Sequence, residues 1–338
     1  MSYAQTLNQL IKGEHLSFEA MQSLMHQVMA GELTPAQIAG VLVALRIKGE
    51  TVDEIAAAAS VMRALSTKVN IQDANHLVDT CGTGGDGIQT FNISTVSAFV
   101  AAAAGAKVAK HGGRSVSSTC GSADVLEALG VNVNLSPEQV ANAVNQVGLG
   151  FMFAPNHHSA MKHAAPVRRE LGIRTLFNLL GPLTNPASAK RQVMGVFSPN
   201  LTAKLAHVLK QLGSEHVMVV CGADGMDEIS FTGNTHVAEL KNGEVHEYTV
   251  NPTQFGLDLH DLSSIKVNDA QESKDMILDL LAGKKGPARD IVLLNAGAAI
   301  YVSGIASTLA DGIKTAAAML DSGKAMQKLQ ALISTSNA

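Results

Sequence analysis

One segment of the chain is rich in glycine where an expected strand passes into an expected helix. Residues 79–87 read Asp-Thr-Cys-Gly-Thr-Gly-Gly-Asp-Gly. Glycine lets successive backbone N–H groups turn toward an anion, and such a nest binds phosphate. The N-terminus of the next helix would add unpaired N–H groups and the positive end of its dipole. An ordinary tight turn would also explain the glycines, and the segment matches neither the P-loop nor the dinucleotide pattern.

Two polar segments follow the glycine-rich one. Residues 90–95 (TFNIST) place four hydrogen-bonding side chains at the start of a helix, whereas a helix cap needs only one. Residues 110–118 (KHGGRSVSS) flank two glycines with a lysine and an arginine, although a solvated loop is the alternative explanation. Ligands of parallel α/β sheets bind at the carboxyl ends of neighbouring strands. Together the loops therefore predict a phosphate-rich substrate.

Acidic residues and histidines offer possible metal ligands. Residues 224–228 (DGMDE) follow another expected strand, and alone they would be read as a polar surface turn. Magnesium prefers oxygen and usually binds through few protein carboxylates plus phosphates, so near a phosphate site this motif predicts magnesium. His157, His158 and His163 could suggest zinc. Adjacent histidines point to different sides of a helix, however, and no further ligand motif is present.

Three arginines, Arg168, Arg169 and Arg174, lie on or just after one expected helix. A guanidinium group binds a carboxylate through two parallel hydrogen bonds. These residues therefore predict a carboxylate-binding role, with a solvated basic face as the alternative.

The elements that must position these motifs fall into two parts. Residues 1 to about 70 show helical spacing with cap residues at Ser17, Thr34 and Thr51, which predicts a small all-helical unit. From His76 onward short strands alternate with helices, which indicates a mostly parallel sheet. A hairpin is expected to turn at Asn242-Gly243, and the chain is helical again from about Glu272. The expected strands are 76–80, 107–110, 131–135, 150–154, 192–197 and 216–222.

Composition limits the class of protein. The chain has 338 residues, of which 46% are hydrophobic and 16% charged, so a large folded core is expected and disorder is excluded. The formal net charge is −4 and no basic cluster exceeds two residues, which argues against nucleic-acid binding. Three widely spaced cysteines fit no disulfide or metal pattern. No apolar signal core or membrane span is found, so we expect a soluble, cytoplasmic protein.

Seven motifs, in order over most of the chain, resemble those of anthranilate phosphoribosyltransferases. They are GTGGD at 82–86, TFNIST at 90–95, KHGGRSVSS at 110–118, GSAD at 121–124, HH with AMKH at 157–163, PVRRELGIRTLFNLLGPLTNP at 166–186 and DGMDE at 224–228. The resemblance implies an α/β fold of the nucleoside phosphorylase/phosphoribosyltransferase kind. A small all-helical domain would accompany a large α/β domain with a mostly parallel central sheet, and a cleft would separate them.

The same resemblance implies domain limits, an activity and an assembly. The helical domain would span 1–72, joined by part of about 165–187, and the α/β domain would span 73–164 and 188–338. The enzyme would transfer the phosphoribosyl group of phosphoribosyl pyrophosphate to the amine of anthranilate, with magnesium, in the second step of tryptophan biosynthesis. A homodimer joined through the helical domain is also implied.

Site residues are carried over by motif. Ser94 would contact one magnesium ion, and Asp227 with Glu228 the other. Gly82, Gly113 and Arg168 would face anthranilate, with 157–163 lining its entry. The residues expected to hold phosphoribosyl pyrophosphate are Gly82, Gly85, Asp86, Thr90, Asn92, Ile93, Ser94, Thr95, Lys110, His111, Gly112, Gly113, Arg114, Ser115, Val116, Ser117, Ser118 and Ser122.

The chemistry of this reaction agrees with these residue types. Breaking the anomeric bond develops negative charge on pyrophosphate, so catalysis needs preorganised donors and metal at the leaving group. Lys110 and Arg114 are the expected catalytic residues, acting on that group. An uncharged arylamine needs little activation, and no general base is evident.

The sequence departs from the family pattern at one position, and two other functions are alternatives to this one. The family usually has asparagine where this chain has Gly113, so an amide that could hydrogen-bond anthranilate is missing. A pyrimidine nucleoside phosphorylase would share the fold but carries a lysine just after the Gly-Asp pair, where Gly87-Ile88 stands here. A catalytically silent paralogue that binds nucleic acid should have a basic groove and lack the paired acids, which this chain keeps.

Overall fold

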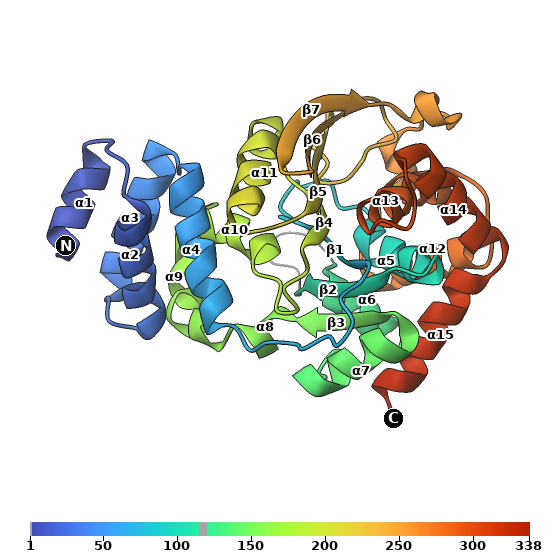
Figure 1. Cartoon of the computed structure of the whole chain (residues 1–338), viewed down its shortest axis with the longest axis horizontal. Helices are drawn as coiled ribbons and strands as arrows, with labels where there is room; N and C mark the ends of the chain where they lie inside the picture. The colour runs from blue at the N-terminus through green and yellow to red at the C-terminus, as the bar shows by residue number, and fades with distance from the viewer. Residues whose placement is uncertain (1, 115–119) are drawn as a thin grey trace.

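Four helices at one end of the elongated molecule form the helical part expected from the sequence (Figure 1). The side chains of Ser17, Thr34 and Thr51 accept hydrogen bonds from backbone N–H groups and begin three of them, as predicted. In this computed structural model, which describes residues 2–114 and 120–338, the helices are α1 (Tyr3–Ile11), α2 (Phe18–Ala30), α3 (Pro35–Lys48) and α4 (Val52–Leu65).

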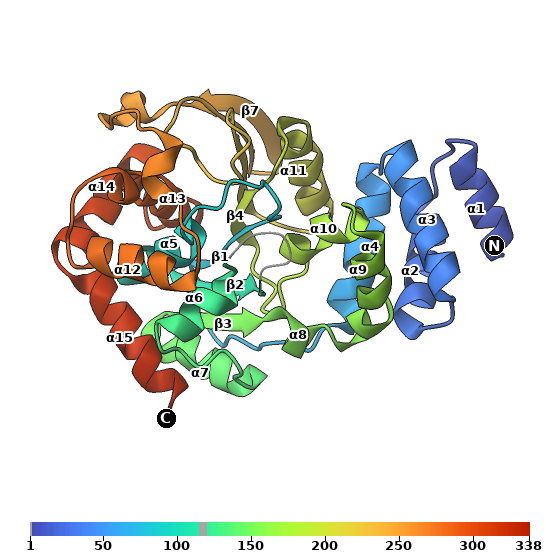
Figure 2. The ribbon, with the colours of Figure 1, turned by 180° about the vertical axis from the view of Figure 1, so that it is seen from behind.

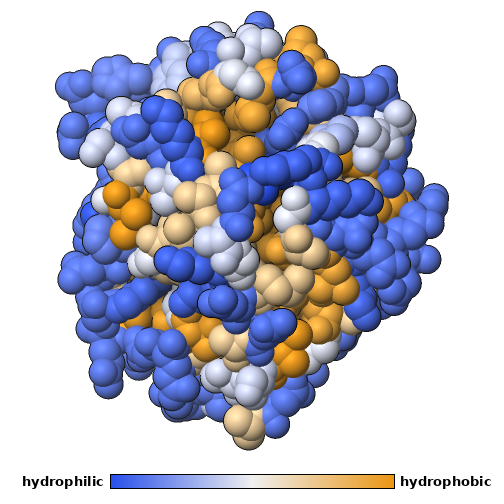
Figure 3. Space-filling view, turned by 90° about the vertical axis from the view of Figure 1, so that its right-hand side faces the viewer, coloured by the Kyte–Doolittle hydropathy of each residue, from blue (hydrophilic) through white to orange (hydrophobic). Residues whose placement is uncertain are grey.

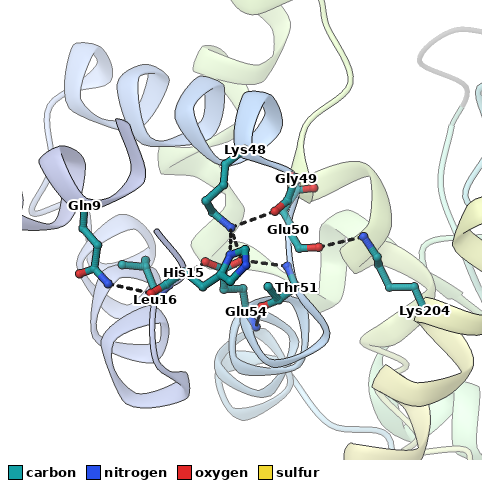
Figure 4. A network of polar contacts seen from close by, with 9 residues as sticks. All are labelled: Gln9, His15, Leu16, Lys48, Gly49, Glu50, Thr51, Glu54 and Lys204. Carbon is teal, nitrogen blue, oxygen red and sulfur yellow. Dashed lines mark hydrogen bonds and ion pairs between the residues drawn. The ribbon is translucent and has the colours of Figure 1, made fainter. Parts of the chain in front are cut away.

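A buried ion pair connects these helices. Lys48 Nζ, at the end of α3, lies 2.8 Å from Glu54 Oε2, in the first turn of α4, and the two side chains are 2% and 0% exposed. Glu54 also accepts a hydrogen bond from the backbone N–H of Leu16. Figure 4 shows this network, together with Lys204 of the α/β part, which donates to the carbonyl of Glu50. The network therefore connects the helices of the helical part with one another and with the α/β part.

A seven-stranded sheet forms the centre of the larger part, in the order β3-β2-β1-β4-β5-β6-β7. The first five strands of this order pair in parallel, whereas β6 pairs antiparallel with β5 and β7 antiparallel with β6, so the sheet is mostly parallel, as predicted. The hairpin turns at Asn242 and Gly243, whose φ angles of 54° and 79° suit a two-residue turn. The strands are β1 (Leu77–Gly82), β2 (Lys107–Gly112), β3 (Leu149–Phe153), β4 (Arg191–Gly195), β5 (His216–Gly222), β6 (Thr235–Lys241) and β7 (Glu244–Val250).

Helices cover both faces of this sheet (Figures 1 and 2). Val78, Val108 and Val193 face a core shared with α5 (Ile93–Ala103), α6 (Ser122–Ala128) and α12 to α15. On the opposite face, Met194 and Val217 share a core with α11 (Thr202–Gln211) and with α2 to α4. The bounds of the others are α7 (Pro137–Val147), α12 (Ala270–Leu281), α13 (Pro287–Val302), α14 (Leu309–Asp321) and α15 (Lys324–Ser336).

The expected strand at residues 131–135 was wrong. Its alternating apolar side chains are buried, so the pattern correctly marks which positions face the core. The backbone, however, pairs with no strand among the described residues: the N–H of Asn132 donates to Ser336 Oγ and that of Asn134 to Asn132 Oδ1. Side-chain acceptors thus replace the strand ladder that the alternation suggested.

Short helices between β3 and β4 lie where the two parts meet (Figure 1). They are α8 (Ala154–His157), α9 (Ala165–Leu171) and α10 (Leu176–Leu180), with 3₁₀ turns at Ser159–His163 and Gly181–Leu183. Leu176, Leu180 and Leu183 are buried in the core that α2 to α4 share. The domain limits themselves stay a prediction.

The end of the molecule opposite the helical part has a mainly hydrophilic surface with scattered apolar areas (Figure 3). The two most exposed large apolar side chains lie at the other end, where Ile11 is 68% and Ile47 81% exposed. No helix within the described part of the chain has the length and apolar character needed to cross a bilayer.

Candidate active site

A cavity of about 310 Å³ opens at the carboxyl edge of the parallel strands. Its walls come from the end of β1 and its glycine loop, the start of α5, the end of β2 and the loop after it, and the segment between β3 and β4. It brings together ten of the predicted site residues: Gly82, Gly85, Ser94, Lys110, His111, Gly112, Gly113, Arg114, Ser122 and Arg168.

The glycine loop closes tightly around Asp227. A Cβ atom at Gly195 would lie 1.5 Å from the backbone oxygen of Asp227, so this position requires glycine. A Cβ atom at Gly82 would lie 2.3 Å from Asp227 Oδ2 and would displace that carboxylate. The N–H of Gly84 donates to Asp227 Oδ2 at 2.8 Å. The glycines therefore make room for, and hydrogen-bond, the acidic side chain of Asp227. The motif alone predicted only a phosphate as their partner.

Three carboxylates gather beside this loop. Burial raises the pKa of Asp227, and the neighbouring Asp86 carboxylate raises it further. Burial also raises the pKa of Glu228, with Asp227 as a second cause, while the nearby backbone N–H of Ser94 opposes this rise. Crowded carboxylates of this kind favour a nearby cation.

These donors fit magnesium. They are hard oxygen atoms, as this ion prefers, and Ser94 approaches the Glu228 carboxylate. Within residues 2–114 and 120–338, no group of three or more His, Cys, Asp and Glu side chains could hold a metal ion by itself. Such an ion would need substrate oxygens to complete its shell, which is usual for magnesium bound with phosphates.

Lys110 is the buried cation of the cavity. Its side chain is 2% exposed, and Nζ donates to the carbonyl of Thr80 and, at 3.1 Å, to Ser94 Oγ. Burial lowers the pKa of this ammonium group, and the carboxylate of Asp79 is the largest opposing influence. Lys110 therefore presents a positive charge at the point where the glycine loop, α5 and β2 meet.

Asp79 and Asn185 support this arrangement, although the motif analysis gave them no role. Asp79 is fully buried; its Oδ1 accepts the N–H of His111 at 3.2 Å and its Oδ2 accepts Asn185 Nδ2 at 2.7 Å. An acidic residue inside an otherwise apolar strand was the signal that could have identified Asp79, because buried carboxylates need partners. Nothing local marks Asn185, which lies more than a hundred residues further along.

Comparisons with known proteins agree with this site. A model described as "Glycosyl transferase family, a/b domain" matches residues 74–326, and one described as "Glycosyl transferase family, helical bundle domain" matches residues 4–66. A protein of Methylobacillus flagellatus named anthranilate phosphoribosyltransferase is 66% identical over 332 residues, which cover 98% of this chain and 97% of that protein. This chain belongs to the anthranilate phosphoribosyltransferase family.

Solved structures of anthranilate phosphoribosyltransferases share the fold. The enzyme of Thermus thermophilus superposes with a TM-score of 0.93 at 44% identity, covering 98% of this chain and 99% of that one. The enzyme of Saccharomyces cerevisiae, in complex with PRPP and Mg, superposes with a TM-score of 0.90 at 27% identity, covering 99% of this chain and 98% of that one. The predicted fold class is therefore confirmed.

A second cavity, of about 610 Å³, adjoins the first and shares His111, Gly113 and Arg168 with it. Residues of the segment predicted to line the anthranilate entry in this family, among them His158 and Met161, contribute to its wall. Met62 of α4 also lines it, so this cavity lies where the helical and α/β parts meet.

Neutral histidines line this junction. The rings of His111 and His158 meet edge to face with centroids 5.1 Å apart. Burial lowers the pKa of His111 to about 3 and that of His158 to about 4, so both are uncharged at neutral pH. His111 Nδ1 lies 3.2 Å from the carbonyl oxygen of Gly181, which orients the ring. The junction is therefore polar without carrying a formal charge on these rings.

Arg168 is one of two arginines that line both cavities. It lies on α9 with its guanidinium carbon 5.4 Å from the centre of the Phe177 ring. Burial lowers the pKa of its guanidinium group. Arg174, by contrast, lies 4.0 Å over Phe197 and lines neither cavity. Of the three arginines that the sequence singled out, Arg168 is thus the one at the junction.

Arg114 lines both cavities, but its guanidinium group is already engaged. It forms ion pairs with Asp124 at 2.9 Å and Glu127 at 2.6 Å, both on α6, and its side chain is 49% exposed. A role at the leaving group would require it to exchange these carboxylates for the substrate. The predicted residues Ser115, Val116, Ser117 and Ser118 lie outside the described residues.

Several predicted residues do not line the first cavity. Ile93 is buried in the hydrophobic core, and Thr95 donates from Oγ1 to Ser122 Oγ at 3.1 Å. Thr90 forms a β-bridge with Lys266. Asp86 accepts the N–H of Ile88 and lies beside Asp227. Asn92 also lies outside the lining set, and its side chain is bonded elsewhere.

Proposed function

We propose that this chain transfers the phosphoribosyl group of phosphoribosyl pyrophosphate to the amine of anthranilate, giving N-(5-phosphoribosyl)anthranilate and pyrophosphate. This is the second step of tryptophan biosynthesis. The observation that carries the proposal is the meeting of a phosphate-type cavity, lined by Lys110, with a second cavity, and Arg168 lines both. The carboxylates of Asp227 and Glu228 lie behind the first cavity, close enough to Lys110 to influence its pKa.

The first cavity is suited to phosphoribosyl pyrophosphate. The glycine loop at 82–87 and the loop that begins at Lys110 offer N–H groups, hydroxyls and a buried ammonium group to anionic oxygens. These are the groups that stabilise a departing pyrophosphate, because negative charge grows there as the anomeric bond breaks. Lys110 is already held in place by Thr80 and Ser94, so it needs little rearrangement to act.

The magnesium requirement is part of this proposal. Ser94, Asp227 and Glu228 would hold the ion, and magnesium, when bound, would neutralise charge on the pyrophosphate. The fit rests on the oxygen chemistry of these side chains and on the crowding of Asp227 against Asp86.

The second cavity is suited to anthranilate. Its carboxylate would pair with the Arg168 guanidinium, and its ring would pack near Phe177, which lines the same space. The amine would then face the first cavity across Gly113, one of the residues that line both cavities. Since the attacking amine is uncharged, neutral His111 and His158 create no conflict with it.

The test is the loss of anthranilate fluorescence on mixing with phosphoribosyl pyrophosphate and magnesium. We expect turnover that stops when EDTA is added. Undiminished turnover in EDTA would contradict the magnesium assignment, and no turnover under any condition would contradict the reaction. Phosphorolysis of thymidine, assayed in parallel, should be absent, because that is the activity of the rival pyrimidine nucleoside phosphorylase.

The homodimer and the compartment are also proposals. Apolar residues of α1 and α3 line a groove of about 550 Å³, and the exposed side chains of Ile11 and Ile47 are among them. A second copy covering this face would bury them, so Ile47→Glu should yield a monomer in light scattering where the unmodified chain is a dimer. We keep the cytoplasm as the expected location, since all three cysteines are buried free thiols.

A further inference from the structure

Asn92 occupies the N-cap position of α5 without capping the helix. An N-cap asparagine normally accepts a hydrogen bond from an N–H of the first turn with its side-chain oxygen. Here Asn92 Oδ1 instead accepts from Ser273 Oγ at 2.7 Å and from Cys120 Sγ at 3.1 Å. Its amide group donates to the carbonyl of Cys120 at 3.2 Å. The side chain is therefore held away from the helix that it begins.

Ser273 makes two bonds to the same residue. Besides donating to Oδ1, its hydroxyl accepts the backbone N–H of Asn92 at 3.1 Å. Ser273 is fully buried on α12, far from the site in sequence, and its single hydroxyl proton is used in this pairing. This reciprocal contact fixes both the backbone and the side chain of Asn92.

The consequence appears at Ser94, the second residue of α5. The backbone N–H of Ser94, a group that a capping asparagine would engage, instead lies close enough to the Glu228 carboxylate to oppose the rise in its pKa. The Ser94 hydroxyl at the same time accepts a hydrogen bond from Lys110 Nζ. The start of α5 thus lies close to Glu228, a proposed metal ligand, and contacts Lys110, while the side chain of its N-cap residue, Asn92, points elsewhere.

We propose that Ser273, with Cys120, is a positioning residue of the donor-substrate site: it withdraws the Asn92 side chain from the helix cap and so leaves the start of α5 to Glu228 and the substrate. The proposal rests on the function proposed above. Without Ser273, the Asn92 amide is free to cap α5 and to compete with Glu228 for the Ser94 N–H.

The first test is Ser273→Ala. One lost hydrogen-bonding group should raise KM for phosphoribosyl pyrophosphate, and its Kd by calorimetry, by ~5- to 10-fold. KM for anthranilate should stay unchanged. Ser97→Ala is the matched control, because Ser97 is equally buried on α5 but its hydroxyl has no hydrogen-bond partner in the described part of the chain. Equal donor affinity in the two variants would overturn the proposal.

The second test separates positioning from general packing. If Ser273 acts through Asn92, then Ser273→Ala should change nothing further in an Asn92→Ala background, whereas independent effects would add. Full additivity in this cycle would overturn the proposal. Thermal melting of each variant checks that the fold is retained.

Substitutions of Cys120 test the same proposal while Ser273 is left unchanged. They remain informative even if the Ser273→Ala variant does not fold. Cys120→Ser keeps a donor to Asn92 Oδ1 and should retain the donor-substrate affinity, while Cys120→Ala should weaken it by ~2- to 5-fold. Equal affinities for the two would count against the proposal. Activity of the unmodified chain is measured alongside, so that a failure of the proposed reaction is distinguishable from a failure of this inference.

Discussion

Buried carboxylates lie near both ends of β5. One is surrounded by hydrogen-bonding partners and the other by further carboxylates. Near its start, Glu239 accepts hydrogen bonds from Tyr301 and Tyr248 at 2.8 and 2.7 Å, and its other contact is His216 Nε2 at 2.8 Å. Burial alone would raise the pKa of Glu239, but these bonds outweigh it and lower the pKa to about 2. Beyond its end, Asp227 has a raised pKa from burial and from Asp86.

The difference separates stability from function. A carboxylate with three partners stabilises the fold in its charged form. A carboxylate crowded by others is destabilised in that form until a cation or substrate arrives, which is typical of functional sites. Both clusters lie on one sheet, so the surroundings and not the fold decide what each carboxylate does.

The largest effect should come from Lys110→Met, which removes the buried cation at the functional end. We expect kcat to fall by ~10²- to 10³-fold, as when one charge-stabilising donor is lost from an active site. Steady-state rates with both substrates saturating measure this. A fall of less than threefold in a folded variant would show that Lys110 does not act on the leaving group.

Asp227→Asn should show that this one residue affects stability and catalysis in opposite directions. Removing a crowded charge should raise the melting temperature of the metal-free protein by a few degrees, since ~1 kcal/mol shifts it by about that much. Activity with magnesium should fall by ~10²-fold, because a proposed metal ligand is lost. A variant that melts lower and remains active would reverse the assignment.

Arg168→Ala should act on the acceptor alone. We expect KM for anthranilate to rise by ~10- to 100-fold from the loss of a charge-assisted bond. KM for phosphoribosyl pyrophosphate should change little. Arg169→Ala, a neighbouring exposed arginine that lines neither cavity, is the control. Unchanged KM and turnover in Arg168→Ala would remove its carboxylate-binding role.

Glu239→Gln should cost stability and leave catalysis intact. The lowered pKa of Glu239 corresponds to ~3 kcal/mol at neutral pH. This contribution is present above the unfolded pKa, near 4.5, and is lost as pH falls toward 2. Urea unfolding from pH 7 down to pH 2.5 should therefore show a steeper loss in the unmodified chain than in the variant. Parallel profiles would contradict the assignment.

The smallest effect should come from Gly113→Asn. A Cβ at this position would meet nothing within 4 Å, so the amide fits at the junction of the two cavities. A new hydrogen bond to anthranilate should lower its KM by roughly 2- to 5-fold. Ring-substituted anthranilates, assayed beside it, should gain less, because the junction becomes narrower. An increase in KM for anthranilate would mean that anthranilate requires the space beside Gly113 to stay empty of side chains.

The sequence predicted which segments meet at one edge of the sheet, because each segment is a contiguous motif. Residues 82–86 and 110–114 lie at the ends of β1 and β2, residues 224–228 follow β5, and parallel strands bring their carboxyl ends to one edge. Helix caps such as Thr34 and Thr51 were predicted correctly for the same local reason.

Features that depend on distant partners could not be predicted in this way. Ser273 approaches Asn92 only after α12 has packed, and Asn185 reaches Asp79 from another segment. Arg114 was expected at the leaving group, yet it pairs with α6 carboxylates whose approach no local pattern encodes. The segment 131–135 shows the same limit for the backbone, since alternation fixes burial but not a strand partner.

A crystal structure with phosphoribosyl pyrophosphate and magnesium tests the central claim most directly. The account predicts that the pyrophosphate lies against residues 82–87 with Lys110 Nζ within hydrogen-bond distance, and that the ion contacts Ser94 or the acids at 227 and 228. A sugar phosphate bound outside this cavity, or a Lys110 side chain with no contact to it, would contradict the account.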